Sequence, residues 1–235
     1  MPLKLQVAIF AGGLCYSLHA QGTFQNLDFE SANLSPIPAG QYGGEVPLSS
    51  ALPGWNASIG GVALTQVLQN SYDLGQASID ILGPNWSYVN PGIIGGTDTV
   101  YLQSGGSPGN STDTVNVSLW QYGSIPGNAQ SLEFSTYNAL GSSPLSVSFD
   151  GNSLSSFLLS SGQTPSGQVY DIYGANIALY AGQIGQLKFT AQFPNWTELD
   201  DITFSPTAVP EPIAMGLSGL GGLMLAFYRR GRPRR

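Results

Sequence analysis

The chain has one cysteine, Cys15, and one histidine, His19. Both lie in the first 20 residues, a segment that we expect to be removed on export. The remaining chain therefore has no disulfide, no thiol nucleophile, no imidazole base, and no thiolate or imidazole metal ligand. These absences exclude catalysis by serine or cysteine with a histidine base, and zinc sites built from histidine or cysteine.

Charge is also scarce, at 9% of residues against a usual share of about 25%. Residues 21–208 contain 13 acidic residues and one basic residue, Lys188, which leaves a formal charge of −12. Nucleic-acid binding depends on Lys and Arg replacing the cations condensed on phosphates. The sequence therefore excludes a nucleic-acid partner.

Long helical patterns are missing as well, since 31 glycines and 16 prolines interrupt the chain. Turn signals instead recur about every 8–12 residues, with short alternating apolar runs between them. The pattern predicts an all-β fold, a single β-sandwich or jelly roll over residues 21–206.

Strands are expected where apolar residues alternate. Asp150-Gly151 predicts a tight hairpin turn leading into a strand over 154–159. The other expected strands are Thr114–Trp120, Leu132–Thr136, Leu145–Phe149, Leu187–Phe193 and Leu199–Phe204, and in the fifth of these Leu187, Phe189, Ala191 and Phe193 share one apolar face.

Residues 1–20 have the features of a secretory signal peptide. Lys4 supplies the basic start, an apolar run follows, and Ala20 is the small residue at the expected cleavage point. A buried first helix is the alternative, which Gly12, Gly13 and the polar change at Gln21 disfavour.

The carboxyl end has three parts in order. Val209-Pro210-Glu211-Pro212 precedes a 16-residue apolar run, 213–228, and the chain then ends in a basic cluster that begins with Arg229 and Arg230. As a helix the run spans about 24 Å, slightly short of a hydrocarbon core. The arginines predict a cytoplasmic end, which places residues 21–208 outside the membrane.

These three parts resemble the PEP-CTERM sorting signal of Gram-negative bacteria. The resemblance implies recognition of Pro210-Glu211-Pro212 by an exosortase, a membrane-anchored intermediate, and a final place at the cell surface or in an exopolysaccharide and biofilm matrix. It assigns residues 207–235 to the sorting signal and the helix 213–228 to a temporary anchor; a plain anchor is the alternative.

The body also resembles galactose-binding-like jelly rolls of secreted bacterial proteins. The landmarks are an opening strand at Asn26–Glu30, then Leu52–Trp55, Tyr180–Gly182 and Leu199–Phe204. Such jelly rolls often hold a structural calcium ion near their first and last strands. The resemblance implies Asp28, Glu30, Asp200 and Asp201 as its ligands, and carboxylate oxygens suit calcium.

A carboxylate pair is the catalytic chemistry that the composition leaves open. Adjacent residues on a strand point to opposite faces, so Asp200 and Asp201 are not expected to share a site, whereas Glu198 and Asp200 do if the strand is regular. The simpler interpretation is that these carboxylates are solvated or cap backbone groups.

Aromatic side chains are the candidates for carbohydrate binding. Trp86 and Tyr88 lie in Gly83–Tyr88 and Trp196 in Phe193–Thr197, two segments that we expect to be loops. A tryptophan in a domain of this size also packs readily into the core.

The sequence therefore predicts an exported, non-enzymatic β-sandwich protein, structural or glycan-binding, in the exopolysaccharide matrix. A polysaccharide-active enzyme with a carboxylate pair is the alternative.

Overall fold

The computed structural model describes residues 23–71, 75–86, 92–107, 109–137 and 145–209. The all-β prediction is confirmed, because the regular structure of these residues is almost entirely strand. The helices in them are the four-residue α1 (Leu48–Ala51) and the three-residue η1 (Ala178–Tyr180). The predicted signal peptide and the predicted apolar helix 213–228 lie outside the described residues.

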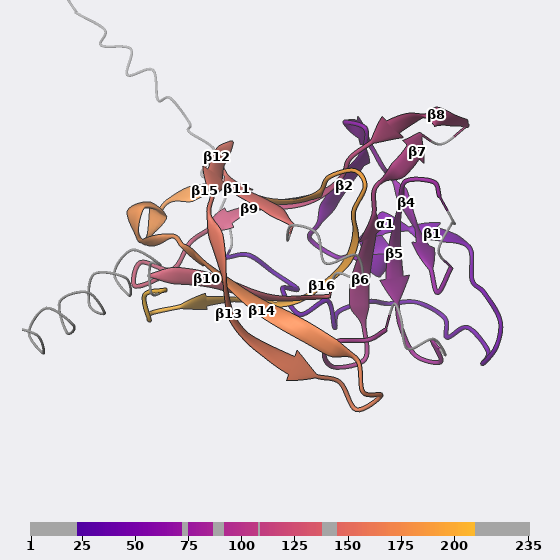
Figure 1. Ribbon diagram of the computed structural model, residues 1–235, viewed down its shortest axis with the longest axis horizontal. Coiled ribbons are helices and arrows are strands. Elements are labelled where there is room, and N and C mark those ends of the chain that lie inside the picture. Colours follow the sequence, from indigo (N-terminus) through magenta and orange to yellow (C-terminus); the bar gives the residue numbers. More distant parts are fainter. Residues whose placement is uncertain (1–22, 72–74, 87–91, 108, 138–144, 210–235) are drawn as a thin grey trace, which may run out of the picture.

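The strands form two large sheets and a small ribbon (Figure 1). The eight-stranded sheet has, in spatial order, β1 (Glu45–Pro47), β4 (Gln66–Gln69), β5 (Ser78–Leu82), β6 (Thr99–Gln103), β16 (Trp196–Ser205), β10 (Ser131–Tyr137), β14 (Val169–Asn176) and β13 (Ser156–Gln163). The six-stranded sheet has β12 (Asn152–Leu154), β11 (Ser146–Phe149), β15 (Ile184–Ala191), β9 (Val117–Ser124), β2 (Asn56–Ile59) and β3 (Val62–Ala63). The ribbon pairs β7 (Gly105–Ser107) with β8 (Asn110–Val115).

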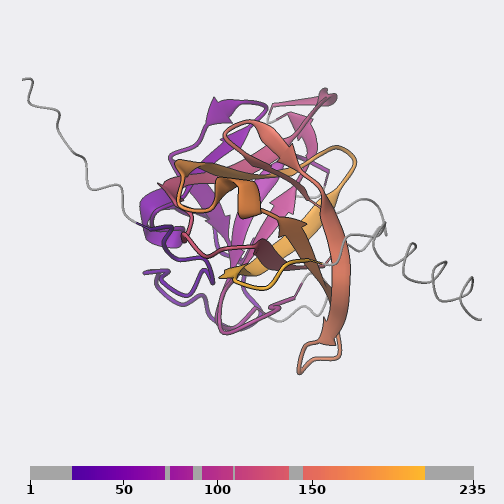
Figure 2. The same cartoon turned by 90° about the vertical axis from the view of Figure 1, so that its left-hand side faces the viewer.

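The two large sheets share one hydrophobic core. Phe134 on β10 meets Phe189 on β15 edge to face, with ring centroids 5.4 Å apart, and both are fully buried. Trp55 lies 6.3 Å from Phe189 and 5.4 Å from Phe29, so the amino-terminal segment joins the same core. In Figure 2 the long β13–β14 hairpin runs along one side of this body.

Apolar alternation predicts several strands correctly. Leu187, Phe189 and Ala191 face the core from β15, and Leu132 and Phe134 face it from β10. The expected hairpin is present as well: Phe149 pairs with Asn152 across Asp150 and Gly151, whose φ angles of 46° and 77° fit a type I′ turn.

Three strand predictions need correction, two of them because the chain changes sheet. The expected strand 114–120 breaks at Asn116, where the chain passes from the β7–β8 ribbon to the six-stranded sheet. The expected strand 154–159 breaks at Ser155, between β12 in one sheet and β13 in the other. Phe193 is not on the apolar face of β15, because the strand ends at Ala191, and its side chain is 52% exposed.

The opening strand at 26–30 is also wrong. Asn26 and Phe29 have φ angles of 49° and 57°, left-handed conformations that do not fit a strand. The segment is a turn that places the Phe29 ring against Trp55 and leaves the Asn26 carbonyl to accept a hydrogen bond from Trp55 Nε1 at 2.9 Å.

The shared core predicts a large effect at Phe134. Phe134→Ala should lower the free energy of unfolding by about 3–5 kcal/mol, because it removes a buried ring that touches both sheets. Urea denaturation measures this, with Val62→Ala as the control at a residue 70% exposed, expected to stay within about 0.5 kcal/mol. Equal, small effects of the two substitutions would contradict a shared core.

Candidate functional site: a buried carboxylate layer

A layer of polar side chains covers the face of the eight-stranded sheet that points away from the other sheet. Strand register sets Asp80 on β5 opposite Tyr101 on β6, and Tyr101 opposite Glu198 on β16. Their chain neighbours, including Ile81, Val100 and Leu199, point into the core, so the row lies on the opposite face. Asp80 and Glu198 are nevertheless fully buried and Tyr101 is 3% exposed.

Glu198 holds two loop segments against this face. Its Oε1 accepts a hydrogen bond from the Gly92 N–H at 2.7 Å. Gln168 Nε2 donates to Oε1 at 3.1 Å and to Oε2 at 2.9 Å. Burial raises the pKa of Glu198 to about 8; the hydrogen bonds from Gln168 and Gly92 oppose this, and the neighbouring charge of Asp200 adds to it.

Asp200 is held in the same way. Thr99 Oγ1 donates to its Oδ2 at 2.5 Å, and the Gly95 N–H donates to the same oxygen at 3.1 Å. The Asp201 N–H donates to Oδ1 at 2.8 Å. Burial raises the pKa of Asp200 to about 7 against these hydrogen bonds, and the charge of Asp201 contributes to the rise. Glu198 and Asp200 are therefore not solvated, since they are 0% and 1% exposed. The other half of that interpretation, the capping of backbone groups, fits the N–H groups of Gly92, Gly95 and Asp201.

A β-bulge decides where the adjacent carboxylates point. The pairing of β16 with β10 shifts register beside Asp201, whose φ is 48°. Leu199 and Ile202 consequently both reach the core although they are three residues apart. Glu198 and Asp200 share the outer face, as expected for a regular strand up to that point, while Asp201 is exposed.

Asp80 is the member of the layer that sequence reasoning missed. The Ser71 N–H donates to its Oδ2 at 2.7 Å, whereas Oδ1 has no hydrogen-bond partner among the described residues. Burial is the largest cause that raises its pKa well above the usual value. The signal was a single acid in the middle of the apolar strand Ser78-Ile79-Asp80-Ile81-Leu82.

A second set of carboxylates lies at the rim of the layer. Glu30 Oε1 accepts from the Thr97 and Asp98 N–H groups at 2.8 and 3.0 Å, and a Cβ at Gly96 would collide with this carboxylate. The pKa of Asp201 is raised by burial and by the charges of Asp28 and Glu30, so these three predicted calcium ligands are neighbours.

The rim does not form a recognisable metal site. No group of three or more Asp, Glu, His or Cys side chains in the described residues is arranged to hold an ion. Glu30 is already used by backbone N–H groups, and Asp200 by Thr99, Gly95 and Asp201. Calcium binding by Asp28, Glu30, Asp200 and Asp201 stays a prediction.

The predicted aromatic residues are not gathered in loops. Trp196 is the first residue of β16 and not part of a loop, and its ring lies 5.9 Å from Tyr101 and 6.5 Å from Tyr137. Trp86 does lie in a turn, but this turn follows β5 at the end opposite to Trp196 in the strand register. Tyr88 lies outside the described residues.

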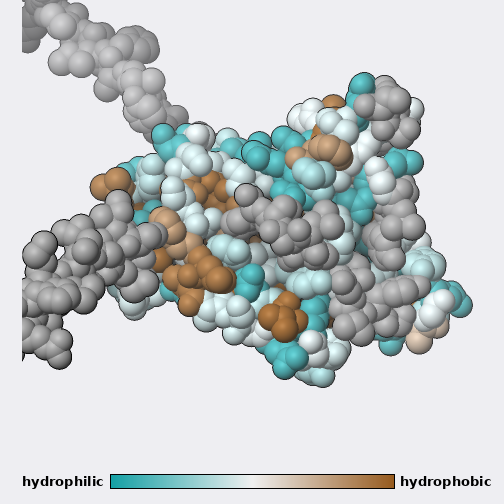
Figure 3. Space-filling model, in the orientation of Figure 1, coloured by the Kyte–Doolittle hydropathy of each residue, from teal (hydrophilic) through white to brown (hydrophobic). Residues whose placement is uncertain are grey.

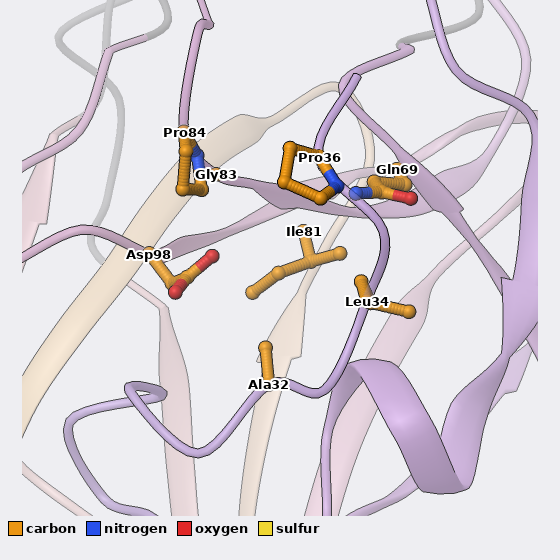
Figure 4. A pocket seen from close by; sticks show the side chains of 8 residues that line it. All are labelled: Ala32, Leu34, Pro36, Gln69, Ile81, Gly83, Pro84 and Asp98. Carbon is orange, nitrogen blue, oxygen red and sulfur yellow. The ribbon is translucent and has the colours of Figure 1, made fainter.

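Two pockets lie beside the eight-stranded sheet. One, of about 80 Å³, lies between the amino-terminal segment and the end of β5, with Asp98 and Gln69 at opposite sides and Ile81 between them (Figure 4). The other, of about 330 Å³, is a largely apolar groove between β4–β5 and the β2–β3 edge. Glu198 and Asp200 line neither pocket, so neither gives a substrate access to this pair.

The residues of the two terminal signals lie almost entirely outside the described part. Ala20, Pro210–Pro212, Arg229 and Arg230 are not described, whereas Val209 is 6% exposed and lies against Gly174 on β14. No helix in the described residues is long and apolar enough to cross a membrane.

Comparisons with known proteins add no identification. The chain matches no protein-family model, and no curated protein or solved structure shows significant similarity to it.

The raised pKa values predict that the protein loses stability as pH rises. Glu198 and Asp200 stay protonated in the folded state up to about pH 8 and pH 7, whereas unfolded carboxyl groups ionise near pH 4. Their contribution is therefore complete below about pH 4 and is lost as pH approaches 8. Urea unfolding should give a free energy at least about 2 kcal/mol lower at pH 8 than at pH 5.

Glu198→Gln tests which group is responsible. The substitution removes the titrating group, and its amide can donate to Gln168 Oε1, which has no partner among the described residues, after a half-turn of the Gln168 amide. The variant should be more stable than wild type at pH 8 and show a smaller decrease from pH 5 to pH 8. Glu45→Gln, on the exposed edge strand β1, should leave the decrease unchanged. A Glu198→Gln variant with an undiminished pH slope would contradict the assignment.

Proposed function

We propose that this protein is an exported, surface-sorted β-sandwich that serves, without catalysis, as a structural or glycan-binding component of an exopolysaccharide matrix. The observation that carries the proposal is the three-part carboxyl-terminal segment, Val209–Pro212, the apolar run 213–228 and the terminal arginines. Its likeness to the PEP-CTERM signal supports an exosortase as the processing partner, a Gram-negative source, and a temporary anchor in the inner membrane.

The position of the signal relative to the fold supports this proposal. Val209 is the last described residue and packs against the sheet, and the next three residues are the Pro-Glu-Pro element. Two sheets packed face to face over one core further support a jelly-roll type of sandwich.

The acidic surface and the aromatic cluster support a carbohydrate partner. Residues 21–208 contain one basic residue, so an acidic polymer has a single cationic side chain with which to form an ion pair. Trp196 and Tyr137 are both partly exposed on the outer face of the sheet, beside the buried Tyr101. Aromatic faces pack well on the C–H groups of sugar rings, and Trp and Tyr keep a polar group for water. Trp86 and Tyr88 remain proposed contributors.

A carboxylate-based glycoside hydrolase is the second candidate. The observation in its favour is that Glu198 and Asp200 share one face and have raised pKa values, as catalytic acids do. Against it, both carboxylates are buried and already accept hydrogen bonds from loop N–H groups, Thr99 and Gln168. These contacts support a structural role for the pair.

The sorting proposal predicts a processing defect in a double variant. Pro210→Ala with Glu211→Ala should leave the protein uncleaved and membrane-bound, because the recognition element is gone. Fractionation and intact mass of the surface protein measure this in the native host, with Thr207→Ala/Ala208→Gly as the matched control just before the motif. Identical processing of the wild type and the Pro210/Glu211 variant would show that the motif is misassigned.

The binding proposal predicts that one tryptophan matters more than another. Trp196→Ala should weaken binding to a purified exopolysaccharide at least about fivefold, the worth of one lost aromatic contact. Trp120→Ala is the control, since this partly exposed ring lies on the other sheet under Lys188. Affinity electrophoresis in gels containing each polysaccharide measures retardation. Reducing-end release that Glu198→Gln abolishes would instead establish the hydrolase.

A further inference from the structure

The two large sheets have four edges in the described residues, and one of them differs from the rest. β1 is three residues long and carries Glu45 and Pro47; β12 has three residues and β3 two. β13 has eight residues, Ser156–Gln163, and pairs only with β14 among the described strands. Short length, charge, proline and β-bulges are the usual protections of a sheet edge, and β13 has only the last, a register shift between Leu158 and Ser160.

The side chains of β13 suit contact with another strand. Leu158 and Leu159 are 56% and 37% exposed, and Val169 at the start of β14 is 55% exposed. Leu158 pairs with Tyr173, which faces Phe134, whereas Leu159 lies against the neighbouring Gly174, so the two leucines lie on different faces. In Figure 3 apolar surface gathers on the part of the molecule where Figure 1 places β10, β13 and β14, while the described surface around β4–β8 is mostly hydrophilic.

Charge selects the kind of partner. Residues 156–170, the whole of β13 and the turn into β14, contain no charged residue, although residues 21–208 carry a formal charge of −12. The single acid of this hairpin, Asp171, lies on β14 and accepts a hydrogen bond from Ser161 Oγ at 2.6 Å. A basic partner would be attracted to the more acidic surface elsewhere and away from the β13 strand. Two copies of the chain repel each other wherever their carboxylates face, and the uncharged β13 edge is where they can approach within hydrogen-bonding distance.

We propose that β13 pairs antiparallel with β13 of a second copy of this chain, about a two-fold axis that sets Leu158 opposite Leu158 of the second copy. The backbone N–H and C=O groups on the free side of β13 then pair with their equivalents, which joins the two eight-stranded sheets into one. Leu158 and Leu159 pack against the partner strand. The inference goes beyond the proposed function and does not depend on it, since it rests on the edge and the charge distribution alone.

A charge-swap experiment tests the pairing. Every residue of the core cluster precedes Pro210, so sedimentation velocity is run on the full chain and on a chain truncated after Val209. Both should form dimers, and Leu158→Lys should weaken association at least about tenfold because like charges then face each other across the pair. Leu158→Glu should do the same, and an equimolar mixture of the two variants should dimerise again. Ser153→Lys, on the short edge strand β12, is the control and should dimerise like the wild type.

Three results would overturn the proposal. The first is a truncated chain that stays monomeric, which would assign self-association to residues 210–235. These residues are the rival occupant of this edge because they follow Val209, which lies against Gly174 as Leu159 does. The second is dimerisation that Leu158→Lys leaves unchanged. The third is a mixture of the Lys and Glu variants that remains monomeric although circular dichroism shows both to be folded.

Discussion

Carboxylates buried without a basic side chain beside them in the described residues are the constraint on which the rest of this structure depends. Lys188 is the only basic residue in residues 21–208 and lies on β15, in the sheet opposite to the one that carries Asp80, Glu198 and Asp200. Residues 21–208 therefore offer the layer no basic partner, and a buried unpaired charge is costly. The acids take two other routes: they retain protons to a higher pH, and they accept hydrogen bonds from backbone N–H groups, Thr99 and Gln168.

These hydrogen bonds explain how the loops are positioned. Gly92, Gly95, Thr97 and Asp98 each present an N–H to a carboxylate from β16 or from the amino-terminal turn, so one loop is joined to partners 67 to 106 residues away in the sequence. The loop that these hydrogen bonds hold in place also covers the carboxylates and keeps them from solvent. Raised pKa values at Glu198 and Asp200 are therefore consistent with a structural element, and chemistry at this layer would require the loop to open.

The sequence predicts the features of the fold that are set by local patterns of residues. Alternation identified the core faces of β10 and β15, and Asp150-Gly151 identified a hairpin, because both are set by neighbours in the chain. The sequence did not predict the bulge at Asp201, the turn at Asn26–Phe29 or the change of sheet at Ser155, because tertiary packing overrides local preference at these positions. The sequence predicted only part of the layer. Glu198 and Asp200 could be placed on one face, but Asp80, Thr99 and Gln168 come from distant segments. A single acidic residue is expected to be solvated unless a buried partner is known.

Direct titration of the layer tests this account at its centre. Carbon-13 NMR of the side-chain carboxyl groups follows the ionisation of Glu198 and Asp200 individually, with Glu198→Gln to assign the first signal. Inflections near pH 8 and pH 7 are expected. Inflections near pH 4, the value for solvated carboxyl groups, would contradict a buried layer whose carboxyl groups keep their protons.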